Sequence, residues 1–292
     1  PNPANLPAGS GRTTAWSPDG SFLSIAHSTS PFITIYERSN TTFTKLANPA
    51  NLPAGAGVGT AFSADGKFLA VAHGTSPFVT VYERSGNTFT KLADPADLPT
   101  GTAMSVAFSR DGKFLAVGFT ASPSNSPSLF IYSISGTTLT KITNPTGLPT
   151  DICRGVAFSP ESDMLIATHG GATALSIYTI SGDTFTKQAD PSPTLPASGF
   201  SCRWSHDGKK VFATSNTTPF LCVFTRSGNT IIRDANLDVL PPNTTRAVGI
   251  SPSQQIIAVA HDTTPFLTLY KTQEPTVTGK SPRILYKFRS VD

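Results

Sequence analysis

The sequence predicts an all-β chain folded as a six-bladed β-propeller with four antiparallel strands in each blade. Three observations lead to this prediction. A turn motif recurs six times within 292 residues. Short runs of β-branched and aromatic residues, the residues favoured in strands, separate the copies of this motif. No segment keeps an apolar period near 3.6, which would indicate a helix.

The turn motif sets the period of the repeat. It reads "SPDG" in the first copy, and its six copies begin at Ser17, Ser63, Ser109, Ser159, Ser205 and Ser251, with spacings of 46, 46, 50, 46 and 46 residues. Leu-Pro pairs keep nearly the same spacing, at Leu6, Leu52, Leu98, Leu148, Leu195 and Leu240. Extra residues in Thr120–Ser128 account for the single longer interval. A unit of this length is close to the ~40–45 residues of a propeller blade.

Each copy contains four strand-like runs. In the second copy they are "VGTAFS", "KFLAVAH", "PFVTVYER" and "NTFTKLA". A tight Asp-Gly turn joins the first two runs, and a turn of the "SGNT" type joins the last two. The propeller is therefore expected to span residues 1–280, with blades at about 3–48, 49–94, 95–144, 145–190, 191–235 and 236–280. Residues 281–292 remain as a basic tail, a linker or a closing strand.

The wording of the repeat resembles known propeller families. "AFSADGKFLAVAHGTSPFVTVYERSGNTFTKLADPADLPTG" is similar to the tryptophan–aspartate (WD-type) repeat and to its lactonase-like bacterial relatives. It departs from the WD-type pattern because it lacks the Gly-His pair and the terminal Trp-Asp. Tyrosine takes the tryptophan place at Tyr36, Tyr82, Tyr132, Tyr178 and Tyr270, with Phe224 in the fifth copy. The segment "SPFVTVYERSGNTFTKLADPADLPTG" also resembles repeats of tailed-phage virion proteins and bacterial surface proteins, which implies a virion or cell-surface setting.

Composition and charge argue against several classes of function. The net charge is +4, but the last 22 residues supply +3 of it, so a basic nucleic-acid-binding surface is not expected. The three cysteines, Cys153, Cys202 and Cys222, have no metal-ligand spacing and are expected to be buried thiols. No apolar run is long enough for a membrane helix, and no signal-peptide pattern is visible.

Both ends of the chain carry linker-like sequence. "NPANL" near the start matches the linkers between blades, and "SPRIL" near the end resembles them. With Thr276–Thr278 as the fourth strand of blade six, the propeller would be a piece of a longer polypeptide. Alternatively, "RILYKF" is itself an edge strand that closes blade six.

The strand order predicts which loops share one face of each blade. The loop between the second and third strands and the linker between blades lie on the same side, here called the top face. Arginine occupies the entrance of the first strand in three copies, and another arginine lies deeper in the fifth copy, at Arg12, Arg154, Arg246 and Arg203. These guanidinium groups could grip an anion through paired hydrogen bonds, or each could pair locally on the rim. The insertion adds Ser122, Asn125 and Ser126 as candidate partner-binding residues.

Two further sets of polar residues recur once per blade and are interpreted as structural. Four histidines share one position, at His27, His73, His169 and His261, and are expected to brace the turn that follows. Four aspartates belong to the tight turns, at Asp19, Asp65, Asp111 and Asp207. Because each set is spread over separate blades, neither a zinc nor a calcium site is predicted.

The sequence therefore favours a non-enzymatic binding or structural module without a cofactor. Its top-face loops would meet a protein receptor, a glycan or a neighbouring virion subunit, outside the cell or on a virion. No catalytic motif is found. Two alternatives stay open: a lactonase-like hydrolase that acts at the arginine-lined channel mouth, and an intracellular scaffold of the WD type.

Overall fold

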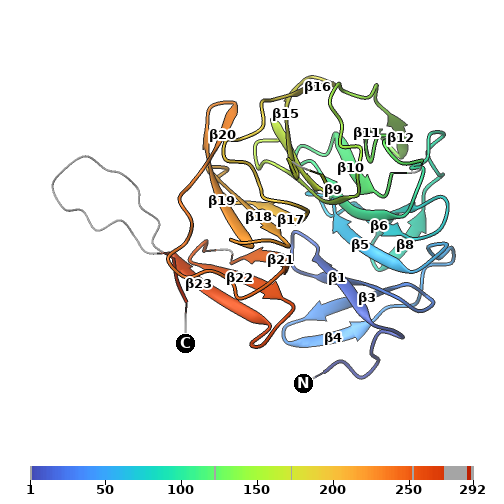
Figure 1. The fold of residues 1–292 in the computed structure, drawn as a ribbon. Coiled ribbons are helices and arrows are strands. Elements are labelled where there is room, and N and C mark those ends of the chain that lie inside the picture. Colours follow the sequence, from blue (N-terminus) through green and yellow to red (C-terminus); the bar gives the residue numbers. More distant parts are fainter. Residues whose placement is uncertain (1, 122, 172, 252, 273–287, 291–292) are drawn as a thin grey trace. The chain divides into compact units, whose positions relative to one another are not determined.

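The chain forms six four-stranded antiparallel sheets, each of which is one blade of a six-bladed β-propeller. The structure is a computed structural model, and it describes residues 2–121, 123–171, 173–251, 253–272 and 288–290. Within each sheet the strands follow the order of the sequence, from the first strand at one edge to the fourth at the other (Figure 1). The fold class predicted from the repeat is confirmed.

The first three blades have nearly identical strands. Blade one contains β1 (Gly11–Trp16), β2 (Phe22–His27), β3 (Ile33–Ser39) and β4 (Thr42–Lys45). Blade two contains β5 (Gly57–Phe62), β6 (Phe68–His73), β7 (Val79–Ser85) and β8 (Thr88–Lys91). Blade three contains β9 (Ala103–Phe108), β10 (Phe114–Phe119), β11 (Leu129–Ser135) and β12 (Thr138–Lys141).

The last three blades follow the same plan. Blade four contains β13 (Cys153–Phe158), β14 (Met164–His169), β15 (Leu175–Ser181) and β16 (Thr184–Lys187). Blade five contains β17 (Gly199–Trp204), β18 (Lys210–Ser215), β19 (Leu221–Ser227) and β20 (Thr230–Arg233). Blade six contains β21 (Thr245–Ile250), β22 (Ile256–His261), β23 (Leu267–Thr272) and β24 (Phe288–Ser290).

The fourth strand of blade six comes from the end of the chain. β24 pairs with β23, so that Phe288 lies opposite Thr272 and Ser290 opposite Tyr270. Phe288–Ser290, within the predicted tail of residues 281–292, supplies this strand, whereas the favoured sequence interpretation assigned it to Thr276–Thr278, which lie outside the described residues. Blade six therefore does not end at residue 280.

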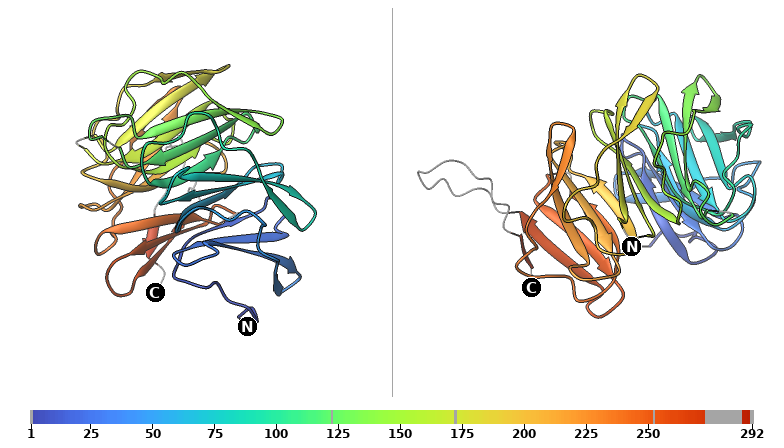
Figure 2. Two further views of the ribbon diagram at one scale, coloured as in Figure 1. Left: turned by 90° about the vertical axis from the view of Figure 1, so that its right-hand side faces the viewer. Right: turned by 45° about the horizontal axis from the view of Figure 1, so that its top comes forward.

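The chain divides into two compact units. The first consists of Pro1–Ala167 and Tyr178–Lys187, and it holds blades one to three and most of blade four. The second consists of Thr168–Ile177 and Gln188–Asp292, and it holds blades five and six. In the first unit β1, β5 and β9 lie next to one another, as Figures 1 and 2 show for the blue to green blades.

The repeated turn is fixed by one serine and one aspartate. In blade one the Ser17 hydroxyl donates to Asp19 Oδ1 at 2.5 Å and accepts the Phe22 amide at 2.8 Å. Asp19 Oδ1 also accepts the Ser21 amide at 3.0 Å. The same serine-to-aspartate bond recurs at Asp65, Asp111 and Asp207. The serine joins both ends of the turn, which explains why the motif is repeated.

The tyrosine in the tryptophan place ties each of blades one to four to the linker that precedes it. Tyr82 is fully buried, and its hydroxyl donates to the Asn51 carbonyl at 2.9 Å. Corresponding bonds join Tyr36 to Asn5, Tyr132 to Asp97 and Tyr178 to Gly147. The linkers are consequently part of the rigid frame.

Neighbouring blades pack face to face through apolar side chains. Phe22 and Ile33 of blade one form a buried cluster with Leu69 and Phe89 of blade two. The rings of Phe22 and Phe89 meet edge to face with centroids 6.0 Å apart. Equivalent clusters join blade two to three and blade three to four. Each repeat forms one blade, and a blade buries its apolar faces only when it packs against its neighbours.

Candidate functional site

The entrance position of the first strand is a β-bulge. In blade one Gly11 pairs with His27 and Thr13 with Ala26, so Arg12 is an extra residue without an opposite partner. Val58 and Arg246 are extra residues in the same way in blades two and six. A bulge bends the strand and redirects a side chain, and bulges are common next to binding sites. The arginine position found in the sequence therefore has a distinct backbone geometry.

The arginines of the first unit differ in burial. Arg12 is exposed on β1, and within the described residues no carboxylate lies within ion-pair distance of it. Arg154 on β13 is half-buried. The entrance positions of the blades between them carry apolar side chains, Val58 and Met104. Of the three entrance arginines, the first unit thus holds the exposed Arg12 and the half-buried Arg154.

The arginines of the second unit have local partners. Arg246 forms a two-pronged ion pair with Asp262, with Nε 2.9 Å from Oδ1 and Nη2 2.6 Å from Oδ2. The hydrogen bond from Arg246 holds the pKa of Asp262 below its usual range. The guanidinium also lies 4.7 Å from the centre of the Phe200 ring. Arg203 is exposed, with Nη1 3.5 Å from the Cys202 carbonyl. The sequence left open whether each arginine binds an anion or pairs locally on the rim, and Arg246 pairs locally, with Asp262.

Asp262 and Phe200 are therefore members of this cluster that sequence reasoning did not single out. A signal was available for Asp262. It directly follows the repeated histidine of blade six, where the other copies carry Ser28, Gly74, Thr120, Gly170 and Asn216. An acid that appears in one copy of a repeat, in the copy that also has an entrance arginine, indicates a compensating pair. Phe200 gave no comparable signal.

The insertion in blade three is held firmly at its base and exposed at its tip. The buried Ser128 donates through its hydroxyl to the Pro149 carbonyl at 3.0 Å and to the Asp151 carbonyl. The backbone amide of Ser128 also donates to the Pro149 carbonyl, at 2.8 Å. These bonds join the insertion to the linker that enters blade four.

The tip of the insertion is a tight turn. The Ser126 amide bonds the Pro123 carbonyl at 3.1 Å, and Asn125 is exposed with a left-handed φ of 68°. Asparagine tolerates this backbone region better than most residues. Ser122, the other predicted partner-binding residue here, lies outside the described residues. The insertion thus presents Asn125 and its neighbours on a fixed turn.

The repeated histidines bond across the sheet. His27 Nε2 lies 2.9 Å from Thr34 Oγ1 on the next strand, and His73 has the same bond to Thr80. His261 pairs with Thr268 at 3.0 Å, and His169 with Ser176 at 3.0 Å. His169 in addition meets its own turn, through Nδ1 and the Gly170 carbonyl at 2.5 Å. Each imidazole thus has a partner on the neighbouring strand. The hydrogen bond to the following turn that the sequence led us to expect is seen for His169, whereas Nδ1 of His27, His73 and His261 has no hydrogen-bond partner among the described residues.

Burial controls the charge of these imidazoles. It lowers the pKa of His73 to about 4 and also lowers the pKa of His27. Both rings are neutral at pH 7. In the part of the chain that the structure describes, no group of three or more His, Cys, Asp or Glu side chains is placed to hold a metal ion. No helix among these residues is long and apolar enough to cross a membrane.

Comparison with known proteins supports the fold. No family model and no curated protein matches the sequence. Among solved structures, a protein from Lactobacillus plantarum superposes with a TM-score of 0.72 at 16% identity, covering 96% of this chain and 83% of that chain. The periplasmic gluconolactonase PpgL of Pseudomonas aeruginosa has a TM-score of 0.67 at 15% identity, covering 96% of this chain and 86% of its own.

A third match is the β-propeller domain of Cps50 (Swd1) from Myceliophteria thermophila. Its TM-score is 0.66 at 10% identity, covering 91% of this chain and 84% of that domain. This chain is a β-propeller. Because these matches include both a lactonase and a domain of a different kind at similar TM-scores, they show the architecture and leave the activity open.

Proposed function

We propose that this protein is a non-enzymatic binding module that displays its top-face loops to a glycan or protein partner on a virion or cell surface. The observation that carries the proposal is the insertion of blade three. It departs from the repeat, it is bonded at its base to the following linker through Ser128, and it exposes Asn125 at its tip. Binding loops on a rigid scaffold have this arrangement.

The surrounding chemistry supports the same proposal. The loops of the top face offer hydroxyl and amide groups, which form adaptable hydrogen bonds with few charges. The described histidines and turn aspartates hold the blade together, and Arg246 is occupied by Asp262. Function in a repeat protein is expected where the copies differ, and the insertion is such a place.

A loop exchange tests the binding surface. Asn125→Gly keeps the left-handed turn while removing the amide, and it can be combined with Ser124→Ala. We expect this variant to lose binding on a printed glycan array or to intact host cells while its thermal midpoint is unchanged. Ser30→Ala and Ser76→Ala, in the regular loops of blades one and two, serve as controls and should bind normally. Unchanged binding by the Asn125 variant would refute the role of the insertion.

Mass spectrometry of the native source tests the setting. Recovery together with capsid, tail or envelope proteins supports a virion or surface module. Recovery as a free soluble chain of this length would rule out that setting. Hydrolysis of lactones that disappears in Arg154→Ala would instead establish the hydrolase alternative.

A further inference from the structure

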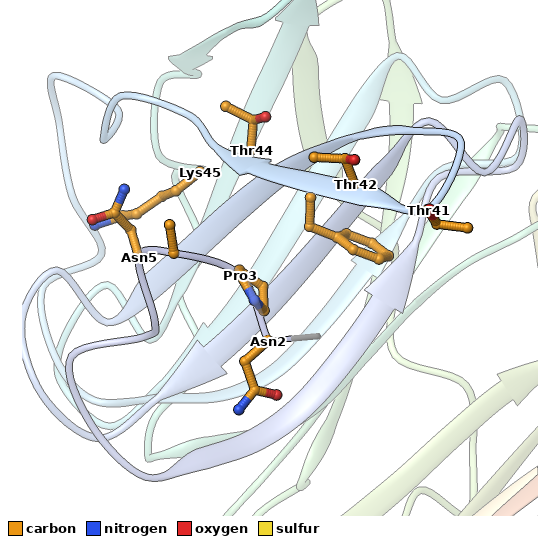
Figure 3. Close-up of a pocket in the computed structure, with 9 residues that line it drawn as sticks. Asn2, Pro3, Asn5, Thr41, Thr42, Thr44 and Lys45 are labelled. Atoms are coloured by element: carbon orange, nitrogen blue, oxygen red, sulfur yellow. The ribbon is translucent and has the colours of Figure 1, made fainter.

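A pocket lies at the outer strand of blade one, away from the insertion of blade three. It has a volume of about 300 Å³ and is formed between the linker residues Asn2–Asn5 and the outer strand β4 with its preceding residue Thr41. Figure 3 shows Lys45 and Asn5 at one end of it and Thr41 and Thr42 at the other, with Pro3 between. This volume is at the lower limit for small-molecule sites and suits a ligand of about one sugar ring.

Strand alternation determines which side chains of β4 face the linker. Phe43 and Lys45 share one face of the strand, and both are half-buried. Thr42 and Thr44 are exposed on the opposite face, and Figure 3 shows them directed away from Pro3. The pocket therefore combines one aromatic ring and one ammonium group from β4 with the linker residues Asn2, Pro3 and Asn5, of which Asn5 directs its amide toward Lys45 (Figure 3).

Comparison with blade two shows how the aromatic residue of this pocket differs from its counterpart. Phe89, the counterpart of Phe43, is buried and contacts both Phe22 and Phe62. Phe43 is less buried, and its described ring contact is with Trp16, at 5.7 Å between centroids. The half-buried Phe43 ring thus remains as a wall of the pocket.

The same comparison shows that Lys45, unlike Lys91 in blade two, has no carboxylate partner among the described residues. In blade two Lys91 Nζ lies 2.6 Å from Asp94 Oδ1. The residue corresponding to Asp94 in blade one is Asn48, which is neutral. Among the described residues no acid lies within ion-pair distance of Lys45, so this cation remains available to an anion from outside.

We propose that this rim pocket binds an acidic sugar, a pyranose that carries a carboxylate. Its apolar C–H face would pack on Phe43 and Pro3, since sugar rings expose such a face. Its hydroxyl groups would meet the Asn5 amide, which both donates and accepts hydrogen bonds. Its carboxylate would pair with Lys45 in a charge-assisted hydrogen bond. This site is distinct from the top-face insertion and does not depend on the function proposed for it.

Titration with glucuronate, and with glucose as its neutral counterpart, tests the proposal by calorimetry or saturation-transfer NMR. We expect glucuronate to bind and glucose to bind at least tenfold more weakly, because one charged hydrogen bond is lost. Lys45→Met should weaken glucuronate binding about tenfold. The matched control Lys91→Met should leave it unchanged, since that lysine is already paired with Asp94.

A second measurement, the pKa of His27, tests whether the bound carboxylate lies close to Lys45. Lys45 contributes to lowering the pKa of His27, whereas the Asp94 carboxylate acts in the raising direction on His73. Bound glucuronate should therefore raise the pKa of His27 in an NMR titration, and glucose should not. The Asn125→Gly variant should bind glucuronate normally, which separates this site from the insertion. Equal binding of the two sugars, no binding of either, or an unchanged Lys45→Met variant would overturn the proposal.

Discussion

Blades two and five have the same strand plan but differ in the chemistry of their interiors. In blade two Phe68 and Leu92 belong to one apolar cluster. The corresponding residues of blade five are Lys210 and Asp234, whose charged atoms lie 2.6 Å apart, with Thr225 bonded to both. The two residues differ together, from an apolar pair to an ion pair. The repeat thus constrains pairs of contacting residues more strongly than single positions.

Other positions of these blades follow the same rule. Blade two has His73 bonded to Thr80, and blade five has Ser215 and Cys222 at these places. In blade three the two positions hold Phe119 and Phe130, whose rings meet at 4.9 Å. In blade five the Ser215 hydroxyl instead donates to the Thr217 carbonyl at 2.7 Å. The comparison predicts that changing one member of a pair is costly and that changing both is tolerated.

The largest effect is expected from breaking the ion pair of blade five. Lys210→Met leaves Asp234 without its cation, and we expect a loss of about 3 kcal/mol in the free energy of unfolding, at the low end for a buried pair because the Asp234 side chain keeps 28% exposure. The double variant Lys210→Met with Asp234→Leu reproduces an apolar pair and should recover most of the loss. Urea denaturation measures both. A double variant as unstable as the single one would contradict the pairing rule.

A smaller loss is expected where two blades approach closely. A Cβ atom added at Gly118 would lie 2.8 Å from both the carbonyl oxygen and the Sγ of Cys153. Gly118→Ala should therefore cost about 2 kcal/mol through overpacking. At the corresponding contact of blades two and three, Ala72 and Ala103 are both fully buried, so two alanines fit there.

The double variant Gly118→Ala with Cys153→Ala copies that arrangement. It should be more stable than Gly118→Ala alone, because the sulfur is removed although the carbonyl remains. A double-mutant cycle in urea measures the coupling. Strictly additive losses would show that the two residues do not share the contact.

The fold, the blade count and the role of the turns could be predicted from the sequence because each rests on a signal repeated six times. The site could be predicted only in part. The entrance arginines were found, but the bulge that isolates Arg12 depends on strand register, which a single strand does not reveal. The fourth strand of blade six was ambiguous because 15 residues, 273–287, separate β24 in the sequence from its partner strand β23. The rim pocket depends on how one linker lies against β4, which no local pattern encodes.

A pH dependence is expected from the histidine of blade two and not from its counterpart in blade five. Burial lowers the pKa of His73 to about 4, from 6.5 in an unfolded chain. Below pH 6.5 the unfolded chain binds a proton that the folded state does not, so stability present above pH 6.5 is lost as the pH falls toward 4. Between pH 7 and pH 5 the loss should be about 1–2 kcal/mol. His27 contributes in the same direction.

Copying the blade-five pair into blade two tests this assignment. The variant His73→Ser with Thr80→Cys has no imidazole there, and its stability should vary less between pH 7 and pH 5 than that of the wild type. Thermal unfolding at several pH values measures the difference. Parallel curves for the two proteins would show that His73 does not cause the acid sensitivity.

The smallest effect is expected from the tyrosine that ties the linker to blade two. Tyr82→Phe removes the bond to the Asn51 carbonyl while the ring stays buried, and it should cost about 1 kcal/mol. Blade five already has phenylalanine at this position, and Phe224 is fully buried. Phe224→Tyr should therefore not stabilise the protein, because its linker is placed without such a bond. Hydrogen exchange of the linker amides near Asn51 should increase in Tyr82→Phe. If Phe224→Tyr instead gained as much stability as Tyr82→Phe lost, the hydroxyl would act alike in every blade, and the linkers of blades two and five would be equivalent.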